Sequence, residues 1–370
     1  MMDVCPWYEA ALLVWKDRLG TSPEAQYALA CKLHDVDRST MKNYAPKWRQ
    51  FVRFCKLRNL QSLPASVSTV VNYVGWMAER GTVRASSMTQ YLSCISKAHT
   101  HVGLTTPVQR GGALIASIVD GMSKLQHAVY TEDEVMYLPA EIADTALDWA
   151  INQLEHVRGV DFRALTDPDR ACLSQFRDHV ALTFNFGDFG RADSQQAMLG
   201  SDISIDSAHR VMFRLRKVKG RSGRVTRLVF QWPAGAQPGL CVVLQCYLWM
   251  REQLQCTPRD RLWVLPFDAA GIRPTSTAKF DLLVQRVLSH HGVTPPSGGF
   301  SYSTRSIRAG AASAAAALNV PLPKIRHLGG WAPDSATPER VYIDPSCPPS
   351  PAGLRFFGWL LLRGDQLPGT

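Results

Sequence analysis

Residues 304–317 read TRSIRAGAASAAAA, and the segments HLGGW at 327–331 and ERVYIDP at 339–345 follow them. The first segment decides the fold of the second half of the chain, because its run of Ala, Gly and Ser is typical of a helix packed closely against its neighbours. Arg305 and Arg308 are three residues apart, so on a helix they lie on one face and present their guanidinium groups in one direction. Two charges on a buried helix need an anionic partner. The pattern therefore predicts an anion site, with charges on an exposed helix as the alternative.

Three further side chains accompany this pair. Arg191 ends the segment FGDFGR at 186–191, Trp331 ends HLGGW, and Tyr342 is the only tyrosine after Trp331. Guanidinium groups bind phosphate oxygens bidentately and stay charged at any working pH. A tyrosine hydroxyl is a competent nucleophile once such an anion is held beside it. The combination indicates chemistry on a phosphodiester.

Composition predicts a folded protein of two domains. The chain has 370 residues, 46% of them hydrophobic, which is enough for two cores of ordinary size. The longest apolar run, Phe356–Leu362, has seven residues, far short of the roughly 20 that span a bilayer. Asp3 and Glu9 precede only a short apolar patch, which makes a poor secretory signal. We expect a soluble, intracellular protein without a membrane partner.

The cysteines and histidines predict neither disulfides nor a metal site. None of the nine cysteines is spaced CxxC, and their odd number argues against a complete disulfide framework. Free thiols in a reducing compartment are the simplest interpretation. His290-His291 is the only adjacent histidine pair, and no acidic or cysteine partner stands at metal-ligand spacing from it. The chain also lacks a GxxxxGK[ST] loop, so no cofactor is expected.

Basic charge is concentrated in two places. The net charge is +10, and residues 1–127 hold 15 Lys and Arg against 8 Asp and Glu. Residues 210–227 hold eight basic residues and no acidic one. Two basic surfaces that grip one polyanion have this distribution, although a solvated surface on a mildly basic protein is the alternative.

Hydrophobic periodicity predicts a helical first domain and a mixed second one. The first has helices at 40–58, 67–78, 86–99 and 106–125, preceded by a further helix at 8–18. Pro46 either begins or kinks the first of the four. In the second domain, strands 211–218 and 225–232 flank Gly220-Arg221-Ser222-Gly223 as a hairpin. Its predicted helices are 141–157, 172–186, 238–254, 278–290, 304–318 and 321–328.

The order of the motifs resembles that of the tyrosine recombinase (phage integrase) family, whose members cut and rejoin DNA through a phosphotyrosine. FGDFGR is similar to the family's first box, and Arg308-Ala309-Gly310 to its second. Leu328–Trp331 looks like the third box, and Tyr342 stands in the place of the nucleophile. The resemblance covers about residues 25–345. The style of the boxes resembles recombinases of eukaryotic mobile elements such as Cryptons and the DIRS group.

This resemblance implies a mainly α fold with a small β-sheet. Residues 1–128 would form a helical core-binding (SAM-like) domain, 129–137 a linker, and 138–347 a mixed α/β catalytic domain. Residues 348–370 would form an apolar segment, LRFFGWLLL within it, that docks either on a neighbouring protomer of a tetramer or on its own domain.

The resemblance also implies roles for single residues. The catalytic set would be Arg191, Lys219, Arg305, Arg308, Trp331 and Tyr342. Arg191 and Arg308 would hold the non-bridging oxygens, and Tyr342 would attack to give a 3′-phosphotyrosine. Lys219 is the candidate acid for the leaving oxygen, with Lys217 as the runner-up. Contacts to double-stranded DNA are expected from Lys42, Lys47, Arg84, Lys97, Lys217, Arg221 and Arg224.

Two positions depart from the family pattern. Arg305 stands where the family often has His, and an arginine cannot accept the tyrosine proton. Ser194 stands where an acidic residue is common, with Asp193 one position off. Both changes leave the phosphate clamp intact and put full catalytic rate in question. These departures leave a catalytically weak or inactive DNA-binding protein descended from a recombinase as one alternative. A type IB topoisomerase, which shares the tyrosine chemistry, is the other. A eukaryotic host would place the protein in the nucleus.

Overall fold

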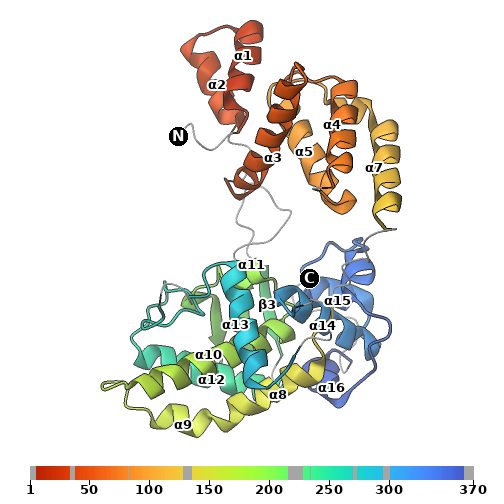
Figure 1. Cartoon of the computed structure of the whole chain (residues 1–370). Coiled ribbons are helices and arrows are strands. Elements are labelled where there is room, and N and C mark those ends of the chain that lie inside the picture. The colour runs from red at the N-terminus through yellow and green to blue at the C-terminus, as the bar shows by residue number, and fades with distance from the viewer. Residues whose placement is uncertain are drawn as a thin grey trace. The chain divides into compact units, whose positions relative to one another are not determined.

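The structure is a computed structural model of the whole chain, and it describes residues 6–33, 38–81, 83–127, 136–215, 228–233, 235–269, 273–294 and 301–361. The chain divides into two compact units, Met1–Asp133 and Glu134–Thr370, and the division falls within the expected linker (Figure 1). Lys217, Lys219, Arg221 and Arg224 lie outside the described residues.

Unit 1 is helical throughout its described part. Its helices are α1 (Tyr8–Leu19), α2 (Pro23–Leu33), α3 (Arg38–Leu57), α4 (Val67–Glu79), α5 (Ala85–His101), α6 (Pro107–Arg110) and α7 (Gly112–His127). Helix α3 begins eight residues before Pro46 and continues through it. The expected helix 106–125 is divided at Gly111 into α6 and α7, and α2 was not predicted.

Aromatic side chains form the core of unit 1. The Phe51 ring meets the Tyr73 ring edge-on with centroids 5.1 Å apart, and both side chains are fully buried. Ser66 accepts a hydrogen bond from the Thr69 backbone N–H and so begins α4, as the sequence indicates. Buried aromatic side chains thus connect α3 and α4.

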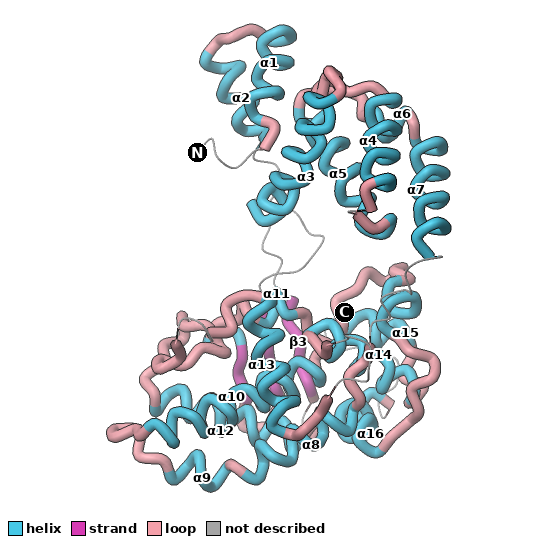
Figure 2. Tube along the Cα trace, in the orientation of Figure 1, coloured by secondary structure: helices cyan, strands magenta, loops and turns pink. Residues whose placement is uncertain are grey.

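Unit 2 is mostly helical with a small antiparallel sheet (Figure 2). Its helices are α8 (Ala140–Asn152), α9 (Leu154–Gly159), α10 (Asp167–Gly187), α11 (Ala192–Gln195), α12 (Pro238–Gln253), α13 (Thr277–His290), α14 (Thr304–Ala317), α15 (Leu322–Leu328) and α16 (Pro351–Phe357), with single turns η2 (Gly200–Asp202), η3 (Pro338–Tyr342) and η4 (Gly358–Leu360). The strands are β1 (Ile203–Ile205), β2 (Val211–Leu215) and β3 (Leu228–Trp232), in the order β1-β2-β3. Phe213 pairs with Ile203 on one side and with Phe230 on the other.

Helix α10 is the centre of unit 2. It packs against α8, α12, α13 and α14, and a capping box between Thr166 and Asp169 begins it. Its fully buried Arg177 donates to Asp178 and to Asp268, which follows α12 by 15 residues. Burial alone would lower the pKa of Arg177, but these two carboxylates outweigh it and raise the pKa above its ordinary value. A paired charge network thus lies within the core.

Helix α14 is buried along most of its length because its small side chains allow close approach. Gly310 faces the backbone of Leu138, where an added Cβ would lie 1.9 Å from the carbonyl oxygen. The Leu138 N–H also donates to the Ser306 carbonyl at 2.9 Å. The alanine-rich sequence therefore places this helix, and Arg308 on it, inside the unit.

Replacing Gly310 with Ala is expected to destabilise unit 2 by about 1–3 kcal/mol, the usual cost of overpacking. Helix propensity alone would favour Ala by roughly 1 kcal/mol, so the sign of the change tests the close approach. Thermal unfolding of the two proteins measures it. Gly159→Ala, on α9 of the same unit and with open space around the added Cβ, is the control and should not destabilise.

The apolar C-terminal segment packs on its own unit as far as Leu361. Helix α16 contacts α8 and α14, and Phe356 and Phe357 are buried. The Phe357 ring lies 4.9 Å from that of Phe189. Gln237 donates to the Phe356 carbonyl at 3.1 Å. Among the described residues, the segment thus packs partly on its own unit, while Leu354 and Leu361 stay exposed. Docking on a neighbouring protomer stays a prediction.

Among the described helices, none combines the length and the apolar character needed to cross a membrane.

Candidate functional site

Arg308 projects from the first half of α14 into a largely buried position, with 3% of its surface exposed. Its two terminal nitrogens donate to the backbone carbonyls of Phe189 and Gly329. Its Nε is buried and has no hydrogen-bond partner among the described residues. No carboxylate pairs directly with this guanidinium among the residues that the structure describes, so its charge is held by carbonyl dipoles. Such a group is prepared to receive an anion.

Trp331 covers the face of this guanidinium. The Arg308 Cζ lies 3.7 Å from the Trp331 ring centroid, a cation–π contact. The two glycines before Trp331 allow its ring to reach this place. Gly330 has a positive φ of 61°, and at Gly329 an added Cβ would lie 1.7 Å from the Trp331 ring. The indole Nε1 is buried and has no hydrogen-bond partner in the part of the chain that the structure describes. The motif HLGGW therefore folds back to stack a tryptophan on an arginine, and its spare donor suits an anionic oxygen.

Tyr342 ends a single π-helical turn and completes the cluster. Its ring lies 5.4 Å from the Trp331 ring and 5.4 Å from the Arg308 Cζ, both measured to ring centroids. Ser313 on α14 donates to the Tyr342 carbonyl at 3.1 Å and accepts from the Asp344 N–H at 2.8 Å. The Tyr342 hydroxyl forms no hydrogen bond with the described residues. The tyrosine backbone is thus attached to the helix that carries Arg308.

Arg191 follows the turn that ends α10. In that turn Phe189 has φ +55°, an unusual conformation for a non-glycine residue, and its ring is anchored by Phe357. The Phe189 carbonyl is the one that accepts from Arg308. Arg191 is half-buried at the N-terminus of α11, and its side chain has no bonded partner within the described part of the chain. The turn between α10 and α11 therefore positions both the Phe189 carbonyl, which accepts from Arg308, and the backbone of Arg191.

Electrostatics place Arg191 and Arg308 in one neighbourhood. Burial, and then the charge of Arg191, lower the pKa of Arg308 to about 9, which leaves it charged at neutral pH. Tyr342 and the carboxylates of Asp188 and Asp193 act in the opposite direction. Mutual repulsion of the arginines falls when an anion lies between them, as expected for a phosphate clamp.

Asp188 is a site residue that sequence reasoning did not single out. It is buried, and burial raises the pKa of its carboxyl well above the usual range although Arg308 opposes this. Gln195 donates to its Oδ2 at 2.5 Å, whereas its Oδ1 has no partner. An acidic residue between two glycines just before Arg191 was the available signal.

The remaining predicted residues are less closely connected. Arg305 is exposed and forms no bond or ring contact with the cluster among the described residues, so the two arginines of α14 do not share one environment. Lys217 and Lys219 lie outside the described residues, as noted above. The structure thus brings together Arg308, Trp331 and Tyr342, with Arg191 in electrostatic reach.

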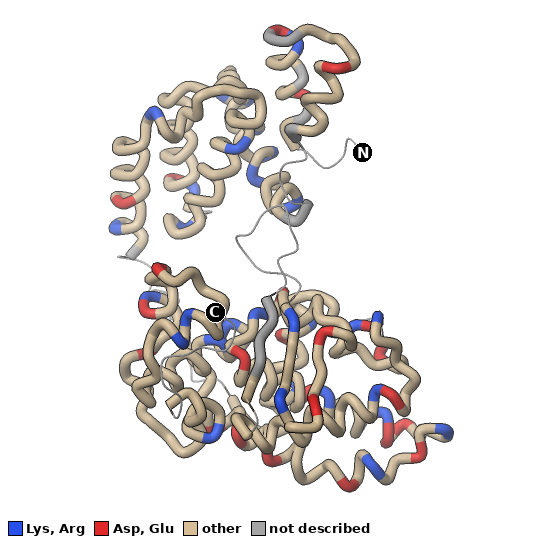
Figure 3. The backbone as a smooth tube through the Cα atoms, turned by 180° about the vertical axis from the view of Figure 1, so that it is seen from behind, with Lys and Arg blue, Asp and Glu red and all other residues tan. Residues whose placement is uncertain are grey.

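In unit 1 the predicted DNA-binding residues lie on α3 and α5 or at the start of α5 (Figure 3 marks Lys and Arg). Lys42 and Arg84 are exposed. Lys47 donates to Asn43 Oδ1 at 2.6 Å and lies 5.6 Å from the ring centroid of Tyr91. Lys97 lines an open hollow of about 470 Å³, together with residues that include Tyr44, Ser96, Thr100 and Gln109. Polar, aromatic and basic groups thus line this hollow.

Phosphate is expected to raise the melting temperature of the wild-type chain and not that of Arg308→Gln. A ligand at ten times its dissociation constant stabilises by about 1.4 kcal/mol, or roughly 3–6 °C for a unit of this size. Thermal unfolding against phosphate concentration, at constant ionic strength set with chloride, measures the difference. Arg259→Gln, an exposed arginine of the same unit, is the matched control. An equal shift in all three proteins would remove Arg308 from the anion site.

Comparisons with known proteins give a limited match. No protein-family model matches the sequence. The chain is 31% identical over 67 residues to an integrase/recombinase XerD homolog of Selenomonas ruminantium, a stretch that covers 18% of this chain. The match spans 19% of the length of that relative. A crystal structure of XerA recombinase aligns with 90% of this chain and 94% of its own, at 13% identity and a TM-score of 0.38. The short sequence match supports a relationship to recombinases of this kind.

Proposed function

We propose that the chain is a tyrosine recombinase that cuts and rejoins double-stranded DNA through a 3′-phosphotyrosine. The observation that supports this most is the buried Arg308, which pairs with no carboxylate of the described residues and contacts the rings of Trp331 and Tyr342. A clamp for one anion next to a phenol suits attack on a phosphodiester. The short match to an integrase/recombinase is consistent with it.

The proposed reaction forms one phosphorus–oxygen bond and breaks another. Arg191 and Arg308 bind the non-bridging oxygens and stabilise the pentacoordinate transition state. The Tyr342 oxygen attacks phosphorus, and the bond to the 5′ oxygen breaks. Lys219, or Lys217 in its place, donates a proton to that oxygen to give a free 5′-hydroxyl. The indole N–H of Trp331, which is buried and unpaired, supplies a further donor to the phosphate.

The phenolic proton of Tyr342 needs an acceptor. Arg305 cannot accept it, since a guanidinium remains charged at working pH. The proton therefore passes to water or to another group of the site. In the second step a DNA hydroxyl attacks the phosphotyrosine and restores a phosphodiester, so the two steps exchange one ester for another. This exchange is nearly isoenergetic and requires no nucleoside triphosphate.

Unit 1 would supply much of the grip on DNA. The basic residues of α3 and α5 are suited to phosphate contacts that do not depend on sequence. The expected result is strongly salt-dependent binding.

Recombination requires two DNA sites, and we propose that the chain self-associates on them as a tetramer. We also propose that the chain is related to recombinases of eukaryotic mobile elements. In a eukaryotic host it would act in the nucleus.

A nicked suicide substrate tests the proposal. Wild-type protein should form a covalent protein–DNA adduct that survives denaturing electrophoresis, and peptide mapping should place the DNA on the peptide that contains Tyr342. A protein that binds the same DNA without forming an adduct would be a catalytically inactive DNA-binding descendant, the alternative that rests on the departures at Arg305 and Ser194.

A type IB topoisomerase is the second candidate, and one observation favours it. Helix α16 packs within its own unit, so the described chain offers no exchanged helix that would require an assembly. Relaxation of supercoiled plasmid at a protein concentration too low for self-association would indicate a topoisomerase. Joined products formed only when two DNA sites are present would indicate a recombinase.

A further inference from the structure

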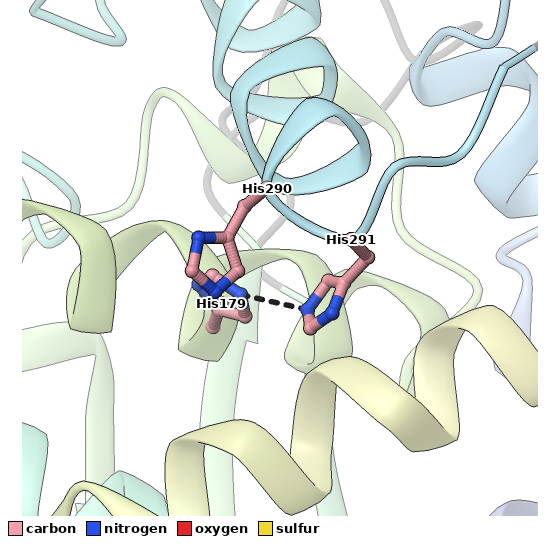
Figure 4. Close-up of side chains that lie close together, drawn as sticks. All are labelled: His179, His290 and His291. Carbon is pink, nitrogen blue, oxygen red and sulfur yellow. Dashed lines mark hydrogen bonds between the residues drawn. The ribbon is translucent and has the colours of Figure 1, made fainter.

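Three histidines from distant parts of the sequence meet on the surface of unit 2. His179 lies in the middle of α10, whereas His290 and His291 end α13 (Figure 4). One ring nitrogen from each lies within 4.8 Å of the others. His179 is buried, His291 is partly exposed and His290 is exposed, so the cluster opens to solvent on one side. It has no part in the phosphodiester chemistry proposed above.

The orientation of His179 leaves a lone pair facing this cluster. Its Nδ1 lies 2.8 Å from the Gln175 carbonyl, which can only accept, so Nδ1 carries the proton and Nε2 does not. This Nε2 lies 3.0 Å from Nε2 of His291. The ring stacks on Trp149 with centroids 3.9 Å apart, which fixes its plane. Metal-binding histidines are typically oriented in this way, with the second ring N–H donated to a backbone carbonyl.

Burial favours the neutral form, which a metal requires, for His179 and His291. Burial lowers the pKa of His179 to about 3, and burial together with His290 lowers the pKa of His291. Protons therefore compete weakly for these nitrogens at neutral pH. Nδ1 of His290 faces the side-chain amide of Gln175, the same residue whose backbone carbonyl orients His179.

We propose that His179, His290 and His291 bind one divalent transition-metal ion, with zinc as the best fit. Imidazole nitrogens suit zinc, and three histidines leave a fourth position for water on the exposed side. Ligands about 2.0–2.1 Å from a tetrahedral zinc are roughly 3.3–3.4 Å apart. The pair formed by His179 and His291 is close to that spacing, and the exposed His290 needs only a small movement to complete it.

The bound ion would connect α10 to the end of α13. Both helices pack against α14, which carries Arg308, so the ion acts as a structural clip beside the site rather than in it. Sequence spacing did not predict such a site, because His179 lies 111 residues before His290.

Equilibrium dialysis of the full-length, tag-free chain against Zn²⁺, with metal content measured by mass spectrometry, tests the proposal. One ion per wild-type chain is expected, and His290→Ala and His291→Ala should each weaken binding at least tenfold. His156→Ala replaces an exposed histidine of the same unit and is the matched control, with binding unchanged. Co²⁺ in place of Zn²⁺ should give the visible absorption of a four-coordinate site in wild type and the control only.

Two outcomes would overturn the proposal: absence of stoichiometric binding to the wild type, or equal binding by all four proteins. Circular dichroism separates metal loss from misfolding. If His291→Ala does not fold, the exposed His290→Ala carries the test alone. Zn²⁺ should also raise the melting temperature of the wild type and of His156→Ala, but not of His290→Ala. This result is independent of DNA cleavage.

Discussion

Tyr342→Phe abolishes the covalent protein–DNA adduct and leaves DNA binding and thermal stability almost unchanged. The substitution removes one oxygen, which is the proposed nucleophile, and keeps the ring that contacts Arg308 and Trp331. Because the hydroxyl forms no hydrogen bond with the described residues, no buried partner is left unsatisfied. Adduct yield on a suicide substrate, read beside equilibrium DNA binding and a melting curve, measures all three properties.

Tyr137→Phe is the matched control, since Tyr137 is another partly exposed tyrosine of unit 2. It should retain the full adduct yield. An adduct that persists in Tyr342→Phe, or one that maps to another tyrosine, would remove Tyr342 from the mechanism. A parallel loss of DNA binding would show instead that the phenol contributes to affinity.

Arg177→Met is expected to cost unit 2 about 3–5 kcal/mol, the usual effect of breaking a buried ion pair from one side. Arg177 lies between Asp178 and Asp268, at 2.5 and 2.8 Å, and all three side chains are almost wholly buried. Methionine fills much of the volume but leaves both carboxylates without their main partner. At roughly 2–4 °C per kcal/mol for a unit of this size, the melting temperature should fall by about 10 °C.

Arg286→Met is the comparison variant. Arg286 pairs with the other oxygen of Asp178 at 2.7 Å but is 37% exposed, so water can replace it and the cost should stay at or below about 1 kcal/mol. If both variants lose the same stability, the burial of Arg177 is not the cause. Adding Asp178→Asn and Asp268→Asn to Arg177→Met should recover part of the loss, since the stranded charges are then removed.

Periodicity and capping residues predict most of the helices. Ser66 begins α4, and the small residues after Arg308 indicate a buried α14, as the structure has it. Helix α2 was missed because its residues show little apolar periodicity. Its signal was Ser22-Pro23-Glu24, a cap with proline in the first turn. Local patterns thus identify elements when one face is clearly apolar and fail when burial is slight.

The site is harder to predict than the helices because its contacts are long-range. Spacing places Arg305 and Arg308 on one side of a helix, yet the buried face includes only Arg308, and Arg305 lies at its solvent edge. No local pattern indicates that Trp331 stacks on Arg308 or that the Phe189 carbonyl accepts from it. The position of His179 opposite His291 likewise depends on how α10 and α13 pack.

Ser313 has a consequence for how active chains would cooperate. Its hydroxyl bonds the Tyr342 carbonyl and the Asp344 N–H to the helix that carries Arg308, so the clamp and the nucleophile belong to one polypeptide. Two defective chains, one lacking the phenol and one lacking the guanidinium, should therefore fail to complement each other when mixed. Under the proposed function, each subunit would cut in cis, and assembly would govern the exchange of strands rather than their scission.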